Sequence, residues 1–491
     1  MTLISLESLV PSDHIVRLME QHIDFSFIDK RTEGLYSTKG RPSIAPQVLI
    51  RMMLIGYLHG ITSERRLCQE VHLNLAYRWF CGLSLEDKVP HHSTFSKNRH
   101  GRFAGTSLFR ELFYEIVQQA LDKGLVRGKH LSTDATLIGA NAAMHSLEPI
   151  TVHFEKEDYW QQLDEENSSA PEERADSNSV PPKDAPEKKG PINQTHRSRT
   201  DPDARVGARW GAKSRLAYSG NYLSDNAHNL ILDVEVTSPS LTDECLSSVE
   251  MVKRVQFRFG LSAQDIGADS AYGRGEVLTG FMEAGVNIYT PKPSNLPKGS
   301  RVHYGKDHFK YDADSDQLIC PEGHRLRRNQ YTSRARLIRY VASPKDCRDC
   351  PVRKQCTQGR CRTVYLNLDQ EALDWAQSLR KRPRYILSQK ERRRIERLFG
   401  EAKEQMGLRR ARRRGLEQMR EQCLMTAMAQ NIKRIVKLSV PKWNLVKKLP
   451  VSLFTSGFLR VFLPDCLAAI MRAFSRLGIF MKLLVQSTVH A

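Results

Sequence analysis

The sequence of 491 residues lacks the features that would direct a chain into or across a membrane. Its first residues, from Met1 to Glu7, contain no basic segment followed by a continuous apolar stretch, so no signal peptide is predicted. No window of about 18 residues is both apolar and uncharged. The segment 451–485 comes closest, but charged residues interrupt it, which favours amphipathic packing helices. We therefore expect a cytoplasmic protein without a membrane partner.

Acidic residues are in short supply relative to basic ones. The chain has 75 Lys and Arg against 55 Asp and Glu, for a formal net charge of +20. The basic excess is dense in residues 390–420, whereas residues 155–187 are mostly acidic. Such an excess attracts polyanions and speeds encounter with them, although a generic basic surface is the simpler alternative.

Cysteines are few outside one short region, which argues against a disulfide framework. Half of the ten cysteines lie between residues 320 and 361. This spacing favours a reducing compartment and a structural zinc ion, with four candidate ligands: Cys320, Cys347, Cys350 and Cys356. Cys361 lies close by, and His324 could complete the first half of the site. The alternative is a group of reduced thiols left from a subdomain that once bound metal.

Residues 1–125 are predicted to be helical. Pro46 suits the first turn of a helix, and Ser63 suits the N-cap of the next. The apolar spacing in 67–79 predicts one helix, and Ser93 is expected to cap a short helix with a basic exposed face. Short helices with basic faces are typical of a DNA-reading module such as a helix-turn-helix. A packing or dimerisation domain fits the same pattern equally well.

From residue 126 to 440 the periodicity changes to alternating strands and helices. Residues 229–236 alternate as a half-buried strand, and strands and helices then follow one another to residue 290. This order predicts an α/β domain with a mixed sheet. Two segments interrupt the domain: residues 155–200, an acidic loop predicted to be disordered, and residues 300–378, a Cys-rich insertion. Residues 441–491 form an amphipathic tail of unknown role.

Three carboxylates stand out within this domain. Asp134 and Asp269 each end a run expected to be a strand, and Glu396 lies in an arginine-rich helix. If the three converge, they can hold two divalent metal ions for in-line phosphoryl transfer on nucleic acid. Mg²⁺ prefers such hard oxygen ligands. A single aspartate of this kind is more often a helix cap or a solvated charge, so the prediction depends on the three together.

The helix around Glu396 also carries basic residues on the same face. Arg392 lies four residues before Glu396 and Lys403 seven residues after it, which places all three on one side. We predict that Arg392 and Lys403 hold DNA phosphates or terminal bases, although a surface helix with salt bridges is the alternative. The densest positive patch follows, and its arginines are predicted to contact phosphates: Arg409, Arg410, Arg412, Arg413 and Arg414.

These motifs resemble those of DDE transposases of bacterial insertion sequences, specifically the branch similar to IS eleven-eighty-two. The segment Arg392-x3-Glu396-x6-Lys403 resembles the signature around the last acid, except that Gln389 stands where the family has a tyrosine. Ser132-Thr-Asp134 and Gly267-Ala-Asp269-Ser-Ala-Tyr272 resemble the first two acids. Residues Gly40–Pro46, Ser63–Leu67, Asn74–Phe80 and His92–Arg99 resemble an InsH-type N-terminal domain. The resemblance spans about residues 5–435.

The resemblance implies a fold, a reaction and a set of partners. The fold would be an RNase H-like mixed sheet with an N-terminal all-helical domain and a Cys-rich insertion. Asp134, Asp269 and Glu396 would bind Mg²⁺ or Mn²⁺, cleave DNA at the element ends and transfer the 3′-hydroxyl into target DNA. The partners would be the terminal inverted repeats, target DNA and at least one further copy of the chain, at the nucleoid. A decayed transposase that only binds DNA and a stand-alone nuclease are the alternatives.

Overall fold

The computed structural model describes residues 5–36, 43–150, 191–208, 213–292, 304–305, 308–332 and 336–440. The chain divides into two compact units, residues 1–436 and 437–491. The elements below belong to the first unit, apart from the end of the last helix. The predicted tail, 441–491, and the core of the predicted acidic loop, 151–190, lie outside the described residues.

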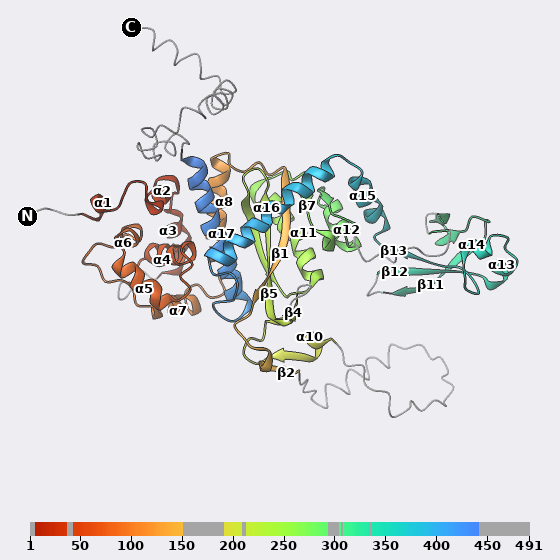
Figure 1. Cartoon of the computed structure of the whole chain (residues 1–491), viewed down its shortest axis with the longest axis horizontal. Helices are drawn as coiled ribbons and strands as arrows, with labels where there is room; N and C mark the ends of the chain where they lie inside the picture. Colours follow the sequence, from red (N-terminus) through yellow and green to blue (C-terminus); the bar gives the residue numbers. More distant parts are fainter. Residues whose placement is uncertain are drawn as a thin grey trace, which may run out of the picture. The chain divides into compact units, whose positions relative to one another are not determined.

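The first part of the chain is helical, as predicted (Figure 1). Pro46 opens its helix, and the hydroxyl of Ser63 accepts the N–H of Arg66 at 3.3 Å. The helix predicted across 67–79 is instead two, because Asn74 caps the second by accepting the N–H of Tyr77. The elements are α1 (Leu6–Leu9), α2 (Ile15–His22), α3 (Phe27–Thr32), η1 (Glu33–Leu35), α4 (Pro46–Leu58), α5 (Glu64–Leu73), α6 (Leu75–Phe80), α7 (Ser93–His100) and α8 (Leu108–Asp122).

A six-stranded mixed sheet follows. Its path runs β4-β5-β1-β7-β8, and β6 also pairs with β5. β1 is antiparallel to β5 and parallel to β7, and β7 is parallel to β8. The strands are β1 (His130–Gly139), β4 (Arg205–Gly207), β5 (Arg215–Asp225), β6 (Leu230–Thr237), β7 (Asp265–Gly267) and β8 (Asn287–Tyr289). The mixed α/β architecture is therefore confirmed.

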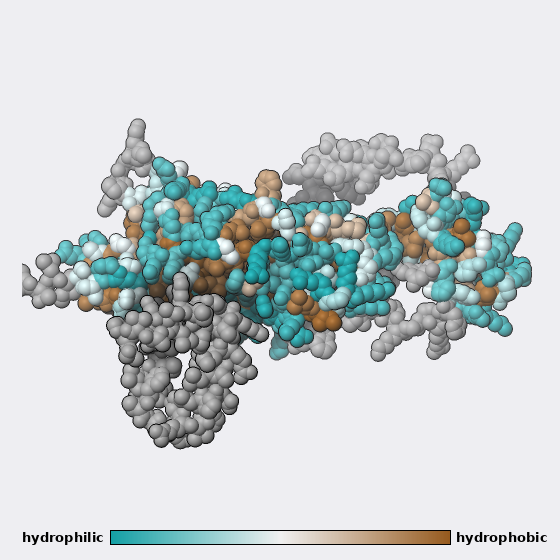
Figure 2. Space-filling model, turned by 90° about the horizontal axis from the view of Figure 1, so that it is seen from above, coloured by the Kyte–Doolittle hydropathy of each residue, from teal (hydrophilic) through white to brown (hydrophobic). Residues whose placement is uncertain are grey.

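Helices connect and cover this sheet. They are α11 (Leu241–Phe259), η3 (Ser270–Tyr272), α12 (Gly275–Glu283), α15 (Gln370–Arg380), α16 (Arg384–Gln405) and α17 (Leu416–Ser439). Because helices α8 and α11 both contact β6, that strand is more buried than its alternation predicted. Its Asp233 is fully buried and forms ion pairs with Arg110 and Arg254. Hydrophilic residues cover most of the coloured molecular surface in the view of Figure 2.

Part of the segment predicted to be disordered is ordered. Residues 191–200 contain α10 (Ile192–Thr195) and β3 (His196–Ser198). β3 pairs with β2 (Leu147–Pro149), which follows η2 (Met144–Ser146). The composition of 155–200 did not predict this strand pair, because the partner strand β2 lies some fifty residues before β3 in the chain.

A second, five-stranded antiparallel sheet forms between residues 310 and 367. Its order is β13-β12-β11-β10-β9. Its core contains Leu318, Leu326, Tyr340, Val364 and Cys356. The elements are β9 (Lys310–Asp312), β10 (Gln317–Ile319), β11 (Arg325–Thr332), β12 (Leu337–Ala342), α13 (Pro344–Arg348), α14 (Arg353–Cys356) and β13 (Thr363–Asn367).

Candidate functional site

Asp134 lies in the middle of β1 rather than at its end. Its register partner on the antiparallel strand β5 is Tyr222, whose ring packs against Phe399 of α16 at 4.6 Å. Paired residues of an antiparallel ladder point to the same face. Asp134 therefore projects toward the face of the sheet that α16 covers. Its Oδ1 also accepts the N–H of Ala135 at 2.8 Å.

Asp269 follows the neighbouring strand β7. Ser132 of β1 is paired in parallel with Gly267 of β7. Asp134 and Asp269 each lie two residues beyond this pair, Asp134 within β1 and Asp269 just after the end of β7. Asp269 also caps η3, because its Oδ1 accepts the N–H of Ala271 at 2.8 Å.

Glu396 reaches this region through Arg392. Both belong to α16, and Arg392 contacts Glu396 Oε1 at 3.4 Å and Asp134 Oδ2 at 3.6 Å. The side chains of Arg392 and Asp134 are 17% and 15% exposed, whereas that of Glu396 is 56% exposed. Arg392 thus places one positive charge between two of the three predicted ligands. Lys403 lies near the C-terminal end of the same helix.

The three acids are not drawn together as tightly as a metal site requires. Among the residues that the structure describes, no group of three His, Cys, Asp or Glu side chains is arranged to hold a metal ion. Asp134 lies within β1 and Asp269 just after β7, and the guanidinium of Arg392 contacts both Asp134 and the exposed Glu396 side chain.

Gln389 anchors α16 beside Asp269. Its Nε2 donates to the carbonyl oxygens of Ala268 at 3.2 Å and Tyr289 at 2.7 Å. These carbonyls belong to the residue before Asp269 and to the end of β8. Gln389 occupies the position where the family signature has a tyrosine, so in this chain the residue has a structural contact that the sequence did not reveal.

His130 provides a second anchor at the start of β1. Its Nε2 lies 2.9 Å from Ser388 Oγ, and its Nδ1 contacts Glu391. Burial lowers the pKa of His130, and the hydrogen bond with Glu391 acts in the opposite direction. These contacts hold α16 to the start of β1 at Glu391, the residue before Arg392.

Gly267 sets how closely α16 approaches the sheet. A Cβ at this position would lie 3.0 Å from Ser388 O and 3.3 Å from the Cβ of Arg392. We expect Gly267→Val to push α16 away, to destabilise the fold by about 1–3 kcal/mol and to lower catalysis more than DNA binding. Denaturation midpoints and strand-cleavage rates measure the two effects.

Gly400 is the matched control for this substitution. It belongs to α16 itself, and a Cβ there would meet nothing within 4 Å. Gly400→Ala is expected to leave cleavage unchanged and to stabilise the helix by up to about 1 kcal/mol. Equal losses of activity in the two variants would contradict the role given to Gly267.

Tyr272 is a residue near the acids whose role the sequence did not predict. Its hydroxyl is buried and has no hydrogen-bond partner among the described residues. Burial raises the pKa of Tyr272 well above its usual value, and the charges of Asp134 and Asp269 raise it further. The hydroxyl therefore stays protonated beside both carboxylates. The only signal in the sequence was its place three residues after Asp269.

The five arginines after α16 do not all share one environment. The guanidinium of Arg412 lies 4.0 Å from the ring of Tyr57 and donates to the carbonyls of Ile61 and Met406. Arg413 is paired with Glu421 at 2.7 Å and with Glu64 at 3.4 Å. Arg413 therefore links α5 to α17, whereas Arg412 packs on α4 and the loop after it. The remaining three are exposed: Arg409, Arg410 and Arg414.

The predicted zinc ligands gather beside the core of the five-stranded sheet. Cys356 is buried in that core, and Cys320, Cys347 and Cys361 pack against it. The Sγ of Cys320 accepts the backbone N–H of His324 at 3.3 Å. Burial raises the pKa of Cys347, and the nearby sulfurs of Cys361, Cys350 and Cys320 raise it further.

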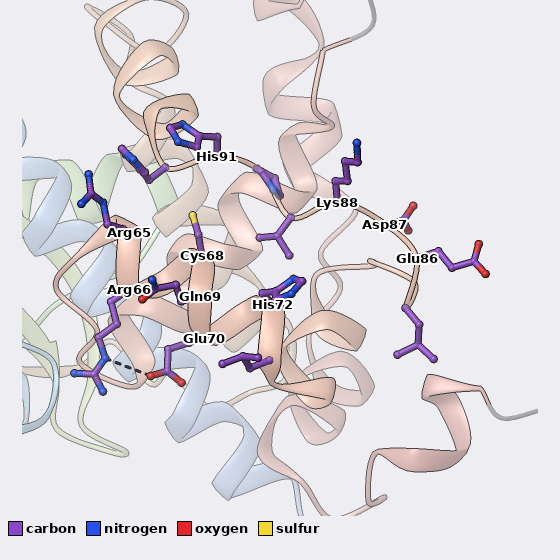
Figure 3. Close-up of a pocket in the computed structure, with 15 residues that line it drawn as sticks. Arg65, Arg66, Cys68, Gln69, Glu70, His72, Glu86, Asp87, Lys88 and His91 are labelled. Atoms are coloured by element: carbon purple, nitrogen blue, oxygen red, sulfur yellow. Dashed lines mark hydrogen bonds and ion pairs between the residues drawn. The ribbon is translucent and has the colours of Figure 1, made fainter.

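A large cavity lies away from the three acids. It measures about 920 Å³ and is lined by residues of α5 and by the segment 85–92 (Figure 3). Its walls mix both charges, with Arg65 and Lys88 beside Glu86 and Asp87. None of the predicted catalytic or DNA-contacting residues lines it, so cavity size does not identify the site here.

Two family models match this chain. The first, described as "Transposase domain (DUF772)", covers residues 4–101. The second, a "Transposase DDE domain", covers residues 319–436, which include Glu396 and the four predicted zinc ligands. None of the curated proteins matches.

One solved structure with a weak likeness is the cryo-EM structure of a piggyBac transposase synaptic complex with hairpin DNA. It is 9% identical, with a TM-score of 0.32, and the match covers 92% of this chain and 84% of that one. A TM-score this low supports no inference about the fold.

The two transposase models on one chain, one at each end of the described unit, define an enzyme that moves DNA segments. Together the two models support a DDE transposase of the kind found in bacterial insertion sequences. None of its helices in the described ranges combines the length and apolar character of a membrane span.

Proposed function

We propose that the six-stranded sheet is an RNase H-like catalytic core and that Asp134, Asp269 and Glu396 are its catalytic acids. The strand order β6-β5-β1-β7-β8, antiparallel on one side of β1 and parallel on the other, supports this fold. The observation that carries the function is that Asp134 and Asp269 each lie two residues beyond the Ser132–Gly267 pair, with Glu396 joined to Asp134 through Arg392.

The three acids offer hard carboxylate oxygens, which suit Mg²⁺ or Mn²⁺. When bound, a pair of such ions activates the attacking oxygen and stabilises the leaving oxygen of a phosphodiester. For all three acids to act together, the exposed Glu396 side chain would turn from Arg392 toward Asp134 and Asp269. Arg392 would then be free to pair with a DNA phosphate, and the protonated Tyr272 hydroxyl could donate a hydrogen bond beside Asp134 and Asp269.

DNA is the proposed partner in three roles: the terminal repeats, the flanking DNA and the target. The half-buried Lys403 and three exposed arginines near α16 would contact phosphates: Arg409, Arg410 and Arg414. The N-terminal helices would read the element ends, with α7 contributing Lys97; Arg99 is excluded because it is paired with Glu64 and Glu421. At least two copies of the chain would bring two ends together, at the nucleoid in the cytoplasm.

A strand-transfer assay tests the proposal. The full chain is incubated with duplexes that carry the element ends and with a supercoiled target plasmid, with Mg²⁺ and with Ca²⁺ in its place. We expect 3′-hydroxyl ends and joined products with Mg²⁺ only. Cleavage without joining would indicate a nuclease, and binding without cleavage would indicate a decayed transposase, which the two transposase models do not favour.

The cysteine cluster is proposed to bind one structural zinc ion. Tetrahedral thiolate sites use backbone N–H bonds to sulfur of the kind that Cys320 accepts. Because the described residues contain no group of three ligands arranged for a metal, the sulfurs would have to draw together as zinc binds.

Zinc analysis of the purified chain tests this assignment. We expect about one zinc per chain, and loss of zinc together with a lower melting temperature in Cys347→Ser. Cys68→Ser, in α5 and outside the cluster, is the control and should keep the metal. Zinc-free protein from a zinc-supplemented culture would contradict the proposal.

A further inference from the structure

The five-stranded sheet has two unlike faces, and the strand register assigns each residue to one of them. Leu326 of β11 is opposite Ala342, and Tyr340 of β12 is opposite Val364. These side chains are buried and form the core face. Residues one position along each strand project to the other side, which we call the outer face.

The outer face carries arginines on neighbouring strands. Arg325 is opposite Ile319 and Arg327 is opposite Gln317, both on β10. On β12, Arg339 is opposite Tyr365 of β13. Because side chains of one face are about 5–8 Å from their cross-strand and diagonal neighbours, these cations form one connected surface.

The helices of this region leave the outer face uncovered. Cys356, at the end of α14, is buried in the core on the opposite side of the sheet. Arg325, Arg327 and Gln330 are exposed, and Tyr365 is 51% exposed. The exposed arginines and the exposed ring of Tyr365 thus share one surface, on which the half-buried Arg339 also lies.

The acids of this region do not neutralise the outer arginines. Between Lys310 and Asn367 the sequence has 13 Lys and Arg against 6 Asp and Glu. Asp316 is engaged by Arg328, Tyr311 and Tyr340 at the core face. Within the described residues, Arg327 and Arg339 form no ion pair, whereas the hydrogen bond from Ser315 and, to a smaller extent, the charge of Arg325 lower the pKa of Asp312.

We propose that the outer face of this sheet binds the phosphate backbone of DNA through Arg325, Arg327 and Arg339. This inference rests on the proposed transposase function, which brings long DNA to the chain. Guanidinium groups suit phosphate oxygens because they donate two parallel hydrogen bonds. The ring of Tyr365 beside Arg339 can pack against a sugar or an unpaired base. Such contacts add affinity and orient the DNA without reading its sequence.

Binding of a labelled 30-base-pair duplex of arbitrary sequence, followed by fluorescence anisotropy at several salt concentrations, tests the proposal. In the full chain, Arg325→Ala with Arg327→Ala should weaken binding about tenfold. The slope of log affinity against log salt should fall by about 2, because two phosphate contacts are lost. Circular dichroism spectra and melting temperatures should match those of the unmodified chain.

Arg328→Ala is the matched control, because Arg328 lies on the same strand but is paired with Asp316 at the core face. It removes one charge of the same sign and should change the salt slope much less. If the double variant binds DNA no more weakly than Arg328→Ala, the outer face does not contact DNA. Loss of self-association in the double variant, with DNA affinity unchanged, would assign the face to a second copy and also overturn the proposal.

The same experiment separates this inference from the function on which it rests. An unmodified chain that neither binds nor cleaves DNA would defeat the proposed function. An unmodified chain that joins ends to a target, with a double variant that binds equally well, would defeat only the role of the outer face.

Discussion

Replacing Asp269 with asparagine is expected to abolish strand cleavage, by at least about a thousandfold, while DNA binding stays within a few-fold. Asparagine keeps the shape and the cap of η3 but removes the charge that a divalent cation needs. Cleavage is measured on element-end duplexes with Mg²⁺, and binding is measured by anisotropy with Ca²⁺ in its place.

Asp265 provides the control on the same strand. It opens β7, four residues before Asp269, and is paired with Arg384 at 3.0 Å. Asp265→Asn removes an equal charge outside the proposed site, so cleavage should fall by no more than a few-fold. Retained Mg²⁺-dependent cleavage in Asp269→Asn would falsify the assignment of this carboxylate.

Replacing Glu421 with glutamine is expected to destabilise the chain by about 3 kcal/mol. Glu421 is 4% exposed, accepts from Arg99 at 2.8 Å and forms an ion pair with Arg413 at 2.7 Å. Without its charge, two mostly buried guanidinium groups face one another with only Glu64 as a shared partner. Urea denaturation followed by circular dichroism should show a lower midpoint for the N-terminal helices and α17 together.

Glu70→Gln is the control for this change. Glu70 pairs with Arg66 four residues away on α5, and both side chains are exposed. Exposed pairs contribute about 0–1 kcal/mol, so the midpoint should barely move. Similar shifts for Glu421→Gln and Glu70→Gln would show that the buried pair does not hold these helices to α17.

The N-terminal helices show that the start of a helix can be predicted from residues within one turn of it. Pro46 and Ser63 begin their helices where the sequence predicted, because a fixed φ and a capping hydroxyl act within one turn. The break at Asn74 was missed, although its side chain caps α6 by the same local mechanism. The helical spacing of apolar residues across 67–79 predicted one continuous helix, and the single polar residue Asn74 was not taken as a helix start.

The arginine segment shows the opposite case. Five arginines within six residues predicted one phosphate-binding patch, yet Arg412 and Arg413 turn inward to Tyr57, Glu64 and Glu421. Charge patterning reports which residues are basic but not where acidic partners hundreds of positions away will lie. Gln389 and Tyr272 were missed for the same reason, because their contacts involve carbonyls and carboxylates on other strands.

By itself, the sequence indicated the chemistry available to this protein: which acids are candidates to bind a cation, which segments are helical, and which transposase domains it resembles. These properties depend on residue type and on neighbours within a few positions. Only the tertiary structure decided that β7 pairs with β1 two residues before Asp134 and Asp269, that Arg392 stands between Asp134 and Glu396, and which arginines stay exposed. Those outcomes depend on strand pairing and helix packing between distant segments, which no local pattern specifies.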